Sequence, residues 1–305
     1  MFRVLMRYLC GVGRGLCALF GAVLLLLLCA GCVTNTEGLV PEGPEISVAK
    51  VNEIAAQLPP HVAQSGLLQV GVNVPYAPNE FKDEDGNIVG FDVDLMNAVG
   101  RVLGVTPVFN QADFDKIIPA IQAGTYDLGM SSFTDTKERE ESVDFVTYFS
   151  AGIQWAQRAG ENVDPENACG LRVGVQTTTT EDIDEVPAKS RECVESGKPP
   201  IDKVKYDSQD DVANALILGR IDALSADSPV TAYAITRSAG RLEAAGAPFD
   251  SAPYGWPVPT GSPLAPVLQQ AMQRLIDDGT YRKIAEKWGV EAGLVERSRI
   301  NGATN

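Results

Sequence analysis

The sequence is short of histidine and of positive charge. His61 is the only histidine among 305 residues, which argues against a histidine-based metal or catalytic site. Lysine and arginine number 25 against 40 aspartates and glutamates, so the formal net charge is −15. Nucleic-acid-binding proteins carry a basic surface, and this balance argues against that class. The net charge suits a soluble surface and says nothing about the sign of a ligand. We expect no metal and no cofactor.

Cysteine is sparse beyond the N-terminus. Four of the six cysteines fall within the first 32 residues. Cys29 and Cys32 spell C-x-x-C, but they end an apolar segment with no other ligands nearby, which argues against a redox or zinc motif. Cys169 and Cys193 remain, and two thiols in an exported domain most often form a disulfide. The alternative is two reduced, buried thiols.

The N-terminus has the pattern of an export signal. Three arginines precede the first acidic residue, and an apolar run, Leu16 to Leu28, ends at Leu28-Cys29-Ala30-Gly31-Cys32. The segment resembles a bacterial lipobox, which implies removal of residues 1–31 and a lipid on Cys32. The protein would then be anchored to the outer face of the cytoplasmic membrane. The alternative is an uncleaved membrane helix over Gly15 to Val33, whose 19 residues are just long enough to span a bilayer.

A proline- and glycine-punctuated stretch follows the predicted lipidation site. Prolines 41, 44, 59 and 60 and glycines 38 and 43 interrupt it. We predict a flexible, lipid-anchored tether over residues 32–66, with room for one short helix within Ile46 to Leu58.

Strand and helix patterns alternate from Leu67 onward. Leu67 to Val72, Thr106 to Phe109 and Asp127 to Met130 read as strands, with helices opening at Phe91 and near Phe114. Alternation of this kind predicts a parallel sheet with helices on both faces. In such sheets, ligands bind at the carboxyl ends of the strands.

The stretch from Asp127 to Arg139 has the pattern of a carboxylate clamp. An apolar strand leads into a turn rich in hydroxyl groups, and Arg139 follows about one helical turn later. Hydroxyls and free backbone N–H groups at a helix start bind anions, and a guanidinium can grip a carboxylate with two hydrogen bonds. The alternative is a solvated turn with an exposed arginine.

A second α/β unit begins near Leu171. Strands are predicted at Leu171 to Val175, Val204 to Tyr206 and Asp222 to Ala226, the last ending at Asp227. A run of four threonines, 177–180, follows the first of these strands. The acids after that run are predicted to be a solvated helix face; they are Glu181, Asp182, Asp184 and Glu185.

Six short motifs in order carry a family resemblance. They are Gly90-Phe91-Asp92-Val93-Asp94-Leu95, Asp113 to Ile121, Thr134 to Arg139, Gly174-Val175-Gln176 with its threonines, Ala223 to Pro229, and Gly279-Thr280-Tyr281 to Trp288. From about Leu67 to Gly289 the chain resembles the polar-amino-acid solute-binding proteins of ABC importers, the family 3 class.

The resemblance implies an α/β fold of two Rossmann-like lobes joined by two crossing hinge strands, the type II periplasmic binding protein architecture. Lobe one would comprise residues 67–150 and 254–290, and lobe two residues 151–253. Residues 291–305 would be a C-terminal tail. The ligand would sit between the lobes, which close on it by a hinge.

The resemblance also assigns binding residues. Arg139 and Thr134 would hold the ligand's α-carboxylate, with donors from Thr179 and Thr180. The remaining predicted contacts are to the α-amino group and the side chain of the ligand; Ser132 and Asp227 would hold the ammonium, Tyr76 and Phe114 would form aromatic walls, and Asn73 would sense the side chain.

Two departures from the family pattern bear on the ligand. Many relatives have glycine inside the lobe-two turn, where this chain has threonines throughout. Several relatives have an acid at the position of Asn73, which would favour cationic side chains. The amide here favours a neutral or acidic amino acid, such as glutamine, asparagine, glutamate or aspartate.

Three functions are consistent with these patterns. The first is a monomeric, lipid-anchored binding protein that delivers a polar amino acid to an ABC permease, and not an enzyme. The second is a sensor that reports ligand occupancy to a membrane kinase. The third is a dehydratase, because a few relatives of this fold are dehydratases; it would need an acid–base pair facing the cleft.

Overall fold

The computed structural model describes residues 40–43 and 46–304. The predicted export signal, Cys32 and the alternative membrane helix therefore lie outside the described residues. Within them, no helix combines the length and the hydropathy needed to cross a membrane.

Lobe one contains a three-stranded parallel sheet in the order β4-β1-β5. The central strand β1 (Leu67–Val72) has the predicted limits, and it lies between β4 (Thr106–Gln111) and β5 (Leu128–Gly129). A hairpin of β2 (Phe81–Lys82) and β3 (Ile88–Val89) turns through Asp85-Gly86, a pair typical of hairpin turns.

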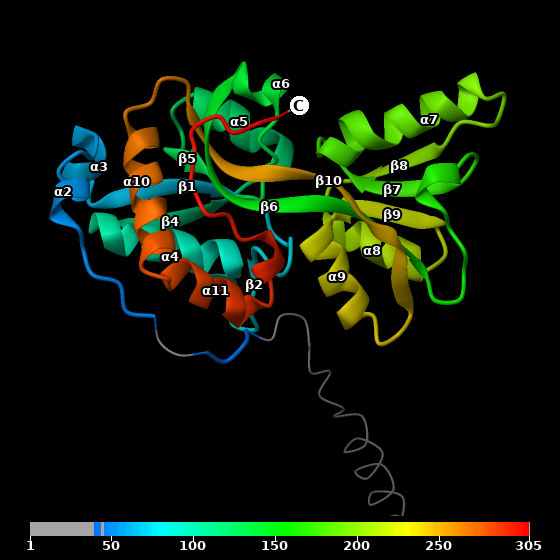
Figure 1. Ribbon diagram of the computed structural model, residues 1–305, viewed down its shortest axis with the longest axis horizontal. Helices are drawn as coiled ribbons and strands as arrows, with labels where there is room; N and C mark the ends of the chain where they lie inside the picture. The colour runs from blue at the N-terminus through cyan, green and yellow to red at the C-terminus, as the bar shows by residue number, and fades with distance from the viewer. Residues whose placement is uncertain (1–39, 44–45, 305) are drawn as a thin grey trace, which may run out of the picture. The chain divides into compact units, whose positions relative to one another are not determined.

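Helices cover both faces of this sheet (Figure 1). Alternate residues of β1 pack with α4 (Phe91–Leu103), α10 (Leu264–Asp277) and α11 (Thr280–Trp288), whereas Gly71 contacts α5 (Phe114–Gln122) on the other face. The apolar stripe of α4 is buried, because each of its four side chains at three- and four-residue spacing is at most 3% exposed; they are Val93, Met96, Val99 and Leu103.

Lobe two is built on a five-stranded mixed sheet in the order β10-β6-β9-β7-β8. The three parallel strands are β7 (Arg172–Gln176), β8 (Asp202–Tyr206) and β9 (Ala223–Asp227). Its helices are α7 (Val186–Glu195), α8 (Gln209–Ile217) and α9 (Ser228–Arg237).

Two long antiparallel strands join the lobes. β6 (Val143–Arg158) has 16 residues and β10 (Leu242–Pro259) has 18, and they pair from one lobe into the other (Figure 1). At about 3.3 Å per residue the strands are roughly 50 to 60 Å long, about three times the usual length of a strand. The predicted architecture of two lobes with two crossing strands is confirmed. The domain limits near residues 150 and 254 fall inside continuous strands and stay a prediction.

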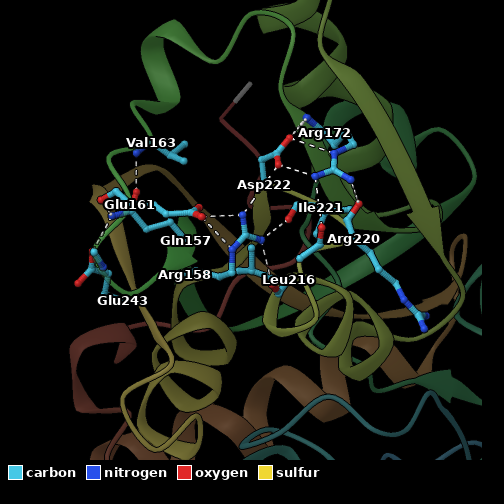
Figure 2. Close-up of polar contacts among 12 residues, drawn as sticks. Gln157, Arg158, Glu161, Val163, Arg172, Leu216, Arg220, Ile221, Asp222 and Glu243 are labelled. Atoms are coloured by element: carbon cyan, nitrogen blue, oxygen red, sulfur yellow. Dashed lines mark hydrogen bonds and ion pairs between the residues drawn. The ribbon is translucent and has the colours of Figure 1, made fainter.

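An arginine-rich cluster holds the end of the lobe-two sheet where β7 and β9 begin (Figure 2). Arg172 makes a bidentate contact with Asp222, at 2.7 and 3.1 Å. Arg158, at the end of β6, donates to the carbonyl oxygens of Leu216 and Ile221 at 3.1 and 2.6 Å. These contacts tie the strands together at the edge opposite the carboxyl ends of β7 and β9.

The structure contains the predicted disulfide between Cys169 and Cys193, with a Cα–Cα distance of 5.5 Å. It links the segment before β7 to α7. Both helix and strand pack in the same core of lobe two, so the bond closes a loop within that lobe.

Part of the predicted tether belongs to lobe one. The stretch 46–66 forms α2 (Asn52–Ala55) and α3 (Pro60–Ser65), and Val62 is fully buried. The backbone N–H of Val51 donates to the carbonyl of Val102 in α4 at 2.9 Å. The reason is that the apolar side chains between the prolines pack on the lobe-one core; they are Ile46, Val48, Val51, Ile54 and Leu58.

The predicted C-terminal tail also packs on lobe one. Ile300 forms a β-bridge with Val146 of β6, and the backbone N–H of Asn301 donates to the carbonyl of Phe145 at 3.0 Å. The backbone N–H of Gly302 donates to Asp135 Oδ2 at 2.7 Å. The chain end therefore lies beside the segment that carries Arg139.

Candidate functional site

A cavity lies where the strand ends of the two lobes meet. Its free space for the centre of a water-sized sphere is about 10 Å³, roughly the room for one water molecule, so the side chains of the two lobes nearly fill it. All nine predicted ligand-binding residues line it, together with three that the sequence did not single out as contacts. The lining residues are Asn73, Tyr76, Phe114, Ser131, Ser132, Thr134, Arg139, Gln176, Thr179, Thr180, Glu181 and Asp227.

Arg139 is the only cation among the lining residues. It lies in the short helix α6 (Lys137–Glu140), whose N-cap Thr136 accepts from the Arg139 backbone N–H at 3.2 Å. Its Nη1 donates to the carbonyl of Thr134 at 2.8 Å, and its Nη2 donates across the cavity to the carbonyl of Thr178 at 3.0 Å. A guanidinium has five N–H donors, so three remain for a ligand. Burial lowers the pKa of Arg139 from its ordinary value.

The lobe-two turn adopts the conformation that glycine would favour. Thr178 has a φ of 64°, in the left-handed region. Its backbone N–H donates to Asp182 Oδ2 at 2.9 Å, and Asp182 pairs with Lys203 at 2.7 Å. These contacts hold the threonine run without glycine, and they direct the Thr178 carbonyl towards Arg139.

Asp227, the last residue of β9, lines the cavity from lobe two. It is 8% exposed, and the Tyr76 hydroxyl donates to its Oδ2 at 2.5 Å across the lobe boundary. Burial, followed by the negative charge of Glu181, raises the pKa of Asp227 to about 8. A cation placed beside this carboxyl would bring the pKa down and ionise it.

For Glu181, which lines the cavity, the predicted exposure to solvent is wrong. It was predicted to be solvated, yet it is 1% exposed and its Oε1 has no hydrogen-bond partner among the described residues. Thr180 Oγ1 donates to its Oε2 at 3.3 Å. Burial raises the pKa of Glu181, and Arg139 partly opposes that shift. A buried carboxyl with a free oxygen on a cavity wall is suited to receive a cationic group.

The other acids of the same run divide between buried and exposed. Asp182 and Glu185 are 3% and 8% exposed, so the predicted solvated face is wrong for them too; Asp184 is exposed. The reason is that residues Glu181–Glu185 form a π-helical turn whose inner side packs on the lobe. Glu185 accepts from Trp155 Nε1 at 3.1 Å.

Asn73 is engaged by the protein on both sides of its amide. Its Nδ2 donates to the carbonyl of Ala112 at 3.0 Å, and its Oδ1 accepts from Gln176 Nε2 at 2.9 Å. Gln176 comes from lobe two, so this contact also joins the lobes. One N–H of Nδ2 and one lone pair of Oδ1 are left for a ligand, but the two contacts fix the orientation of the amide.

Phe114 forms the aromatic side of the cavity beside Arg139. Its ring stacks on Phe133 with the centroids 4.4 Å apart and the planes 16° apart. The Arg139 guanidinium carbon lies 5.8 Å from the Phe114 centroid and 5.7 Å from that of Phe133. The predicted aromatic, hydroxyl and charged groups thus meet in one place, while their individual roles stay predictions.

Residues 68–291 match the family of bacterial extracellular solute-binding proteins, family 3. The chain belongs to this family. It is 46% identical over 291 residues to the arginine-binding protein ArgT of Corynebacterium glutamicum, covering 94% of this chain and 96% of that one.

Solved structures agree with this membership. An ancestral arginine-binding protein bound to arginine is 34% identical, with a TM-score of 0.68, over 73% of this chain and 98% of that one. An ancestral amino-acid-binding protein described as a precursor of cyclohexadienyl dehydratase is 31% identical, with a TM-score of 0.65, over 75% and 97%.

The expected preference for a neutral or acidic ligand is not supported. That expectation came from Asn73 alone, whose amide is engaged by the protein. The cavity has two buried carboxyls, Glu181 and Asp227, against one guanidinium. Two of the relatives named above bind arginine according to their descriptions.

Proposed function

We propose that this protein captures a basic amino acid, L-arginine in the first place, between its two lobes and delivers it to an ABC importer. The observation that carries the proposal is the charge of the cavity: Glu181 and Asp227 are buried in its lining, where Arg139 is the single cation. An amino acid with a cationic side chain brings two positive groups and one negative group. It would pair each buried charge, whereas a neutral or acidic amino acid would leave Glu181 unpaired.

Each end of the ligand has a matching group. Arg139 and Thr134 would hold the α-carboxylate, with Thr179 and Thr180 donating from lobe two. Asp227 and Ser132 would hold the α-ammonium. This arrangement uses contacts from both lobes, so the ligand would favour the closed form.

The ligand side chain would run between the aromatic groups to Glu181. A planar guanidinium stacks on aromatic rings, and Tyr76 and Phe114 line the cavity. The same plane can make two parallel hydrogen bonds to one carboxylate, which an ammonium cannot do. This geometry favours arginine over lysine and ornithine.

Export and lipidation complete the proposed role. The N-terminal pattern supports cleavage after residue 31 and a lipid on Cys32, which would keep the protein at the outer face of the membrane where a permease is reached. Labelling with a radioactive fatty acid, compared between wild type and Cys32→Ser, tests the anchor; equal label in both would contradict it.

A ligand panel tests the binding specificity. Thermal unfolding and isothermal titration would be measured with L-arginine, L-lysine, L-ornithine, L-histidine, L-glutamine and L-glutamate. A ligand at about 100 times its Kd stabilises the native state by about 2.7 kcal/mol, so arginine should give the largest shift at equal concentration. Greater stabilisation by glutamine or glutamate than by arginine would overturn the proposal.

Arg139→Ala is the negative control for the whole panel. Removing a buried charge partner costs about 2–5 kcal/mol, or at least about thirtyfold in affinity. The loss should apply to every amino acid, because all of them carry the α-carboxylate. Near-wild-type affinity for arginine in this variant would refute the carboxylate clamp.

A further inference from the structure

Two fully buried carboxyls lie behind the cavity wall, outside the ligand contacts described above. Glu80 precedes β2 and Asp92 lies in the first turn of α4, and both side chains are 0% exposed. Neither forms an ion pair with a lysine, arginine or histidine in the part of the chain that the structure describes. Two uncompensated charges in this position would be strongly destabilising.

The two carboxyls meet at one hydroxyl, because Ser132 Oγ lies 3.3 Å from Asp92 Oδ2 and 3.5 Å from Glu80 Oε2. Two ionised carboxylates that share a buried neighbour repel each other, so the pair is stable only with a proton on one of them. Asp92 Oδ2 already accepts from Tyr148 at 2.5 Å and from Ser132 at 3.3 Å. These donors favour the ionised form of Asp92, which places the proton on Glu80.

The direction of the pKa shifts agrees with this assignment. Burial, and then the neighbouring charge of Asp92, raise the pKa of Glu80 well above its ordinary 4.5, and Asp227 adds to the effect. The pKa of Asp92 rises less, to about 6, because burial is opposed by the hydrogen bonds it accepts from Tyr148 and Ser132.

The pair holds the two serines at the carboxyl end of β5. Ser131 Oγ lies 3.0 Å from Glu80 Oε1, and it also accepts from the backbone N–H of Asn73 at 3.1 Å. Ser132 Oγ lies 3.3 Å from Asp92 Oδ2 and 3.5 Å from Glu80 Oε2. Both serines and Asn73 line the cavity.

Ser132 also needs such support for its backbone. Its φ is 51°, in the left-handed region that serine adopts only when its surroundings over-determine it. Asn79 Nδ2 donates to its Oγ at 2.8 Å, so Asn79, Glu80 and Asp92 surround the one hydroxyl.

We propose that Glu80 and Asp92 are positioning residues that share one proton and hold Ser131 and Ser132 in the conformation that the ligand cavity requires. The proposal rests on the proposed function, because the proposed contact of Ser132 with the α-amino group makes its position matter for affinity. Glu80 acts as the neutral partner and Asp92 as the acceptor for Tyr148 and Ser132.

Substitutions in the full chain test this division of roles by titration with L-arginine at pH 7. Glu80→Gln keeps the shape and the neutral state, so its Kd should stay within about threefold of wild type. Glu80→Ala should weaken binding at least about tenfold, because Ser131 loses its partner, and Asp92→Asn should do the same, because a neutral amide oxygen replaces the charged acceptor of Ser132 and Tyr148. Glu84→Gln, at an exposed acid of the same hairpin, is the matched control and should not change Kd.

Infrared difference spectroscopy tests the shared proton without any ligand. The wild-type spectrum minus that of Glu80→Gln at pH 7 should contain the C=O band of a protonated carboxylic acid. The proposal is overturned if this band is absent, if all three substitutions bind arginine like wild type, or if Asp92→Asn is tolerated and Glu80→Gln is not. If wild type binds no amino acid, the proposed function and the positioning role both fail, and the band alone decides whether the pair shares a proton.

Discussion

Replacing Glu181 by glutamine should remove the preference for a cationic ligand while sparing the fold. The carboxyl is 1% exposed, its Oε1 has no partner among the described residues, and Arg139 is the cation that influences its pKa. Glutamine keeps the size and the acceptor oxygen but has no charge. In the proposed complex it would face the ligand guanidinium without ionic attraction.

The size of the effect follows from burial. Two unit charges about 4 Å apart attract by about 4 kcal/mol at an effective dielectric constant of about 20. Part of this is offset by the cost of desolvating both groups, and losing one partner of a buried pair costs about 2–5 kcal/mol in practice. We therefore expect Glu181→Gln to weaken L-arginine binding by about 30-fold to about 5,000-fold.

Isothermal titration with two ligands isolates the charge. L-Glutamine has the same α-groups and no charged side chain, so its affinity should change by less than about threefold or improve in Glu181→Gln. Asp184→Asn removes the same charge from an exposed position of the same π-helical turn, and it should affect neither ligand. An equal loss for arginine and glutamine, or no loss for arginine, would refute the assignment of Glu181 to the ligand side chain.

Further predictions concern protons, backbone and covalent structure. Burial raises the pKa of Asp227 to about 8, and the ammonium of a bound ligand would ionise it. Arginine binding at pH 7 should therefore release protons, and the affinity should increase as the pH rises towards 8. Titration heats that do not depend on the ionisation enthalpy of the buffer would contradict this prediction. Burial raises the pKa of Glu185 from 4.5 to about 7, so its stabilising contribution is present below pH 4.5 and is lost as the pH rises through 7. In denaturant unfolding, the stability of Glu185→Gln relative to wild type should therefore increase by about 3 kcal/mol between about pH 4 and about pH 9. A stability difference that does not change with pH would argue against this prediction. Thr178→Gly should raise the free energy of unfolding by about 0.5–1 kcal/mol, because glycine adopts the left-handed conformation without strain, whereas Thr177→Gly should lower it. A change of the same sign in both variants would contradict the assignment of strain to Thr178. Reducing the disulfide, which closes a separation of 24 residues, should lower the unfolding free energy by about 3.5 kcal/mol on the chain-entropy estimate, and an unchanged denaturation midpoint would show that the loop is already constrained.

Local patterns predicted the elements and the place of the site. Leu67–Val72 is a strand with the limits that its apolar and β-branched residues suggested, and α4 and α5 begin at Phe91 and Phe114 as predicted. The rule that ligands bind at the carboxyl ends of parallel strands placed Asp227 and the turn after β5 together, and both line the cavity. The spacing of apolar residues and the residue types of turns are local features of a few residues each, so a single sequence is enough to predict them.

Burial of polar residues was not readable in the same way. Glu181 and Asp184 lie in one acidic run, yet one is 1% exposed and the other is exposed. The difference depends on which side of the π-helical turn meets the rest of the lobe, and that is a tertiary contact. A signal was nevertheless present, because Glu181 directly follows Thr180, a predicted ligand contact at a strand end.

Long-range pairing was equally inaccessible. Ile300 pairs with Val146, and Gly302 donates to Asp135, across more than 150 residues of chain. Nothing in the composition of the last residues distinguishes a docked segment from a free one. The partner is the open edge of β6 in lobe one, and its presence depends on the topology of the whole sheet.

The two lobes present the cavity through a similar device. Ser132 in lobe one and Thr178 in lobe two both adopt left-handed backbone conformations without being glycine. Each is held by a buried carboxyl, Asp92 beside Ser132 and Asp182 beside Thr178. Strained residues persist only where the surrounding fold stabilises them, so the free-energy cost of their left-handed conformation is already offset when the protein folds. A ligand then meets walls that are already ordered, and less of its binding free energy is lost to ordering them. Substitutions of the supporting acids should therefore reduce affinity more than their distance from the ligand suggests.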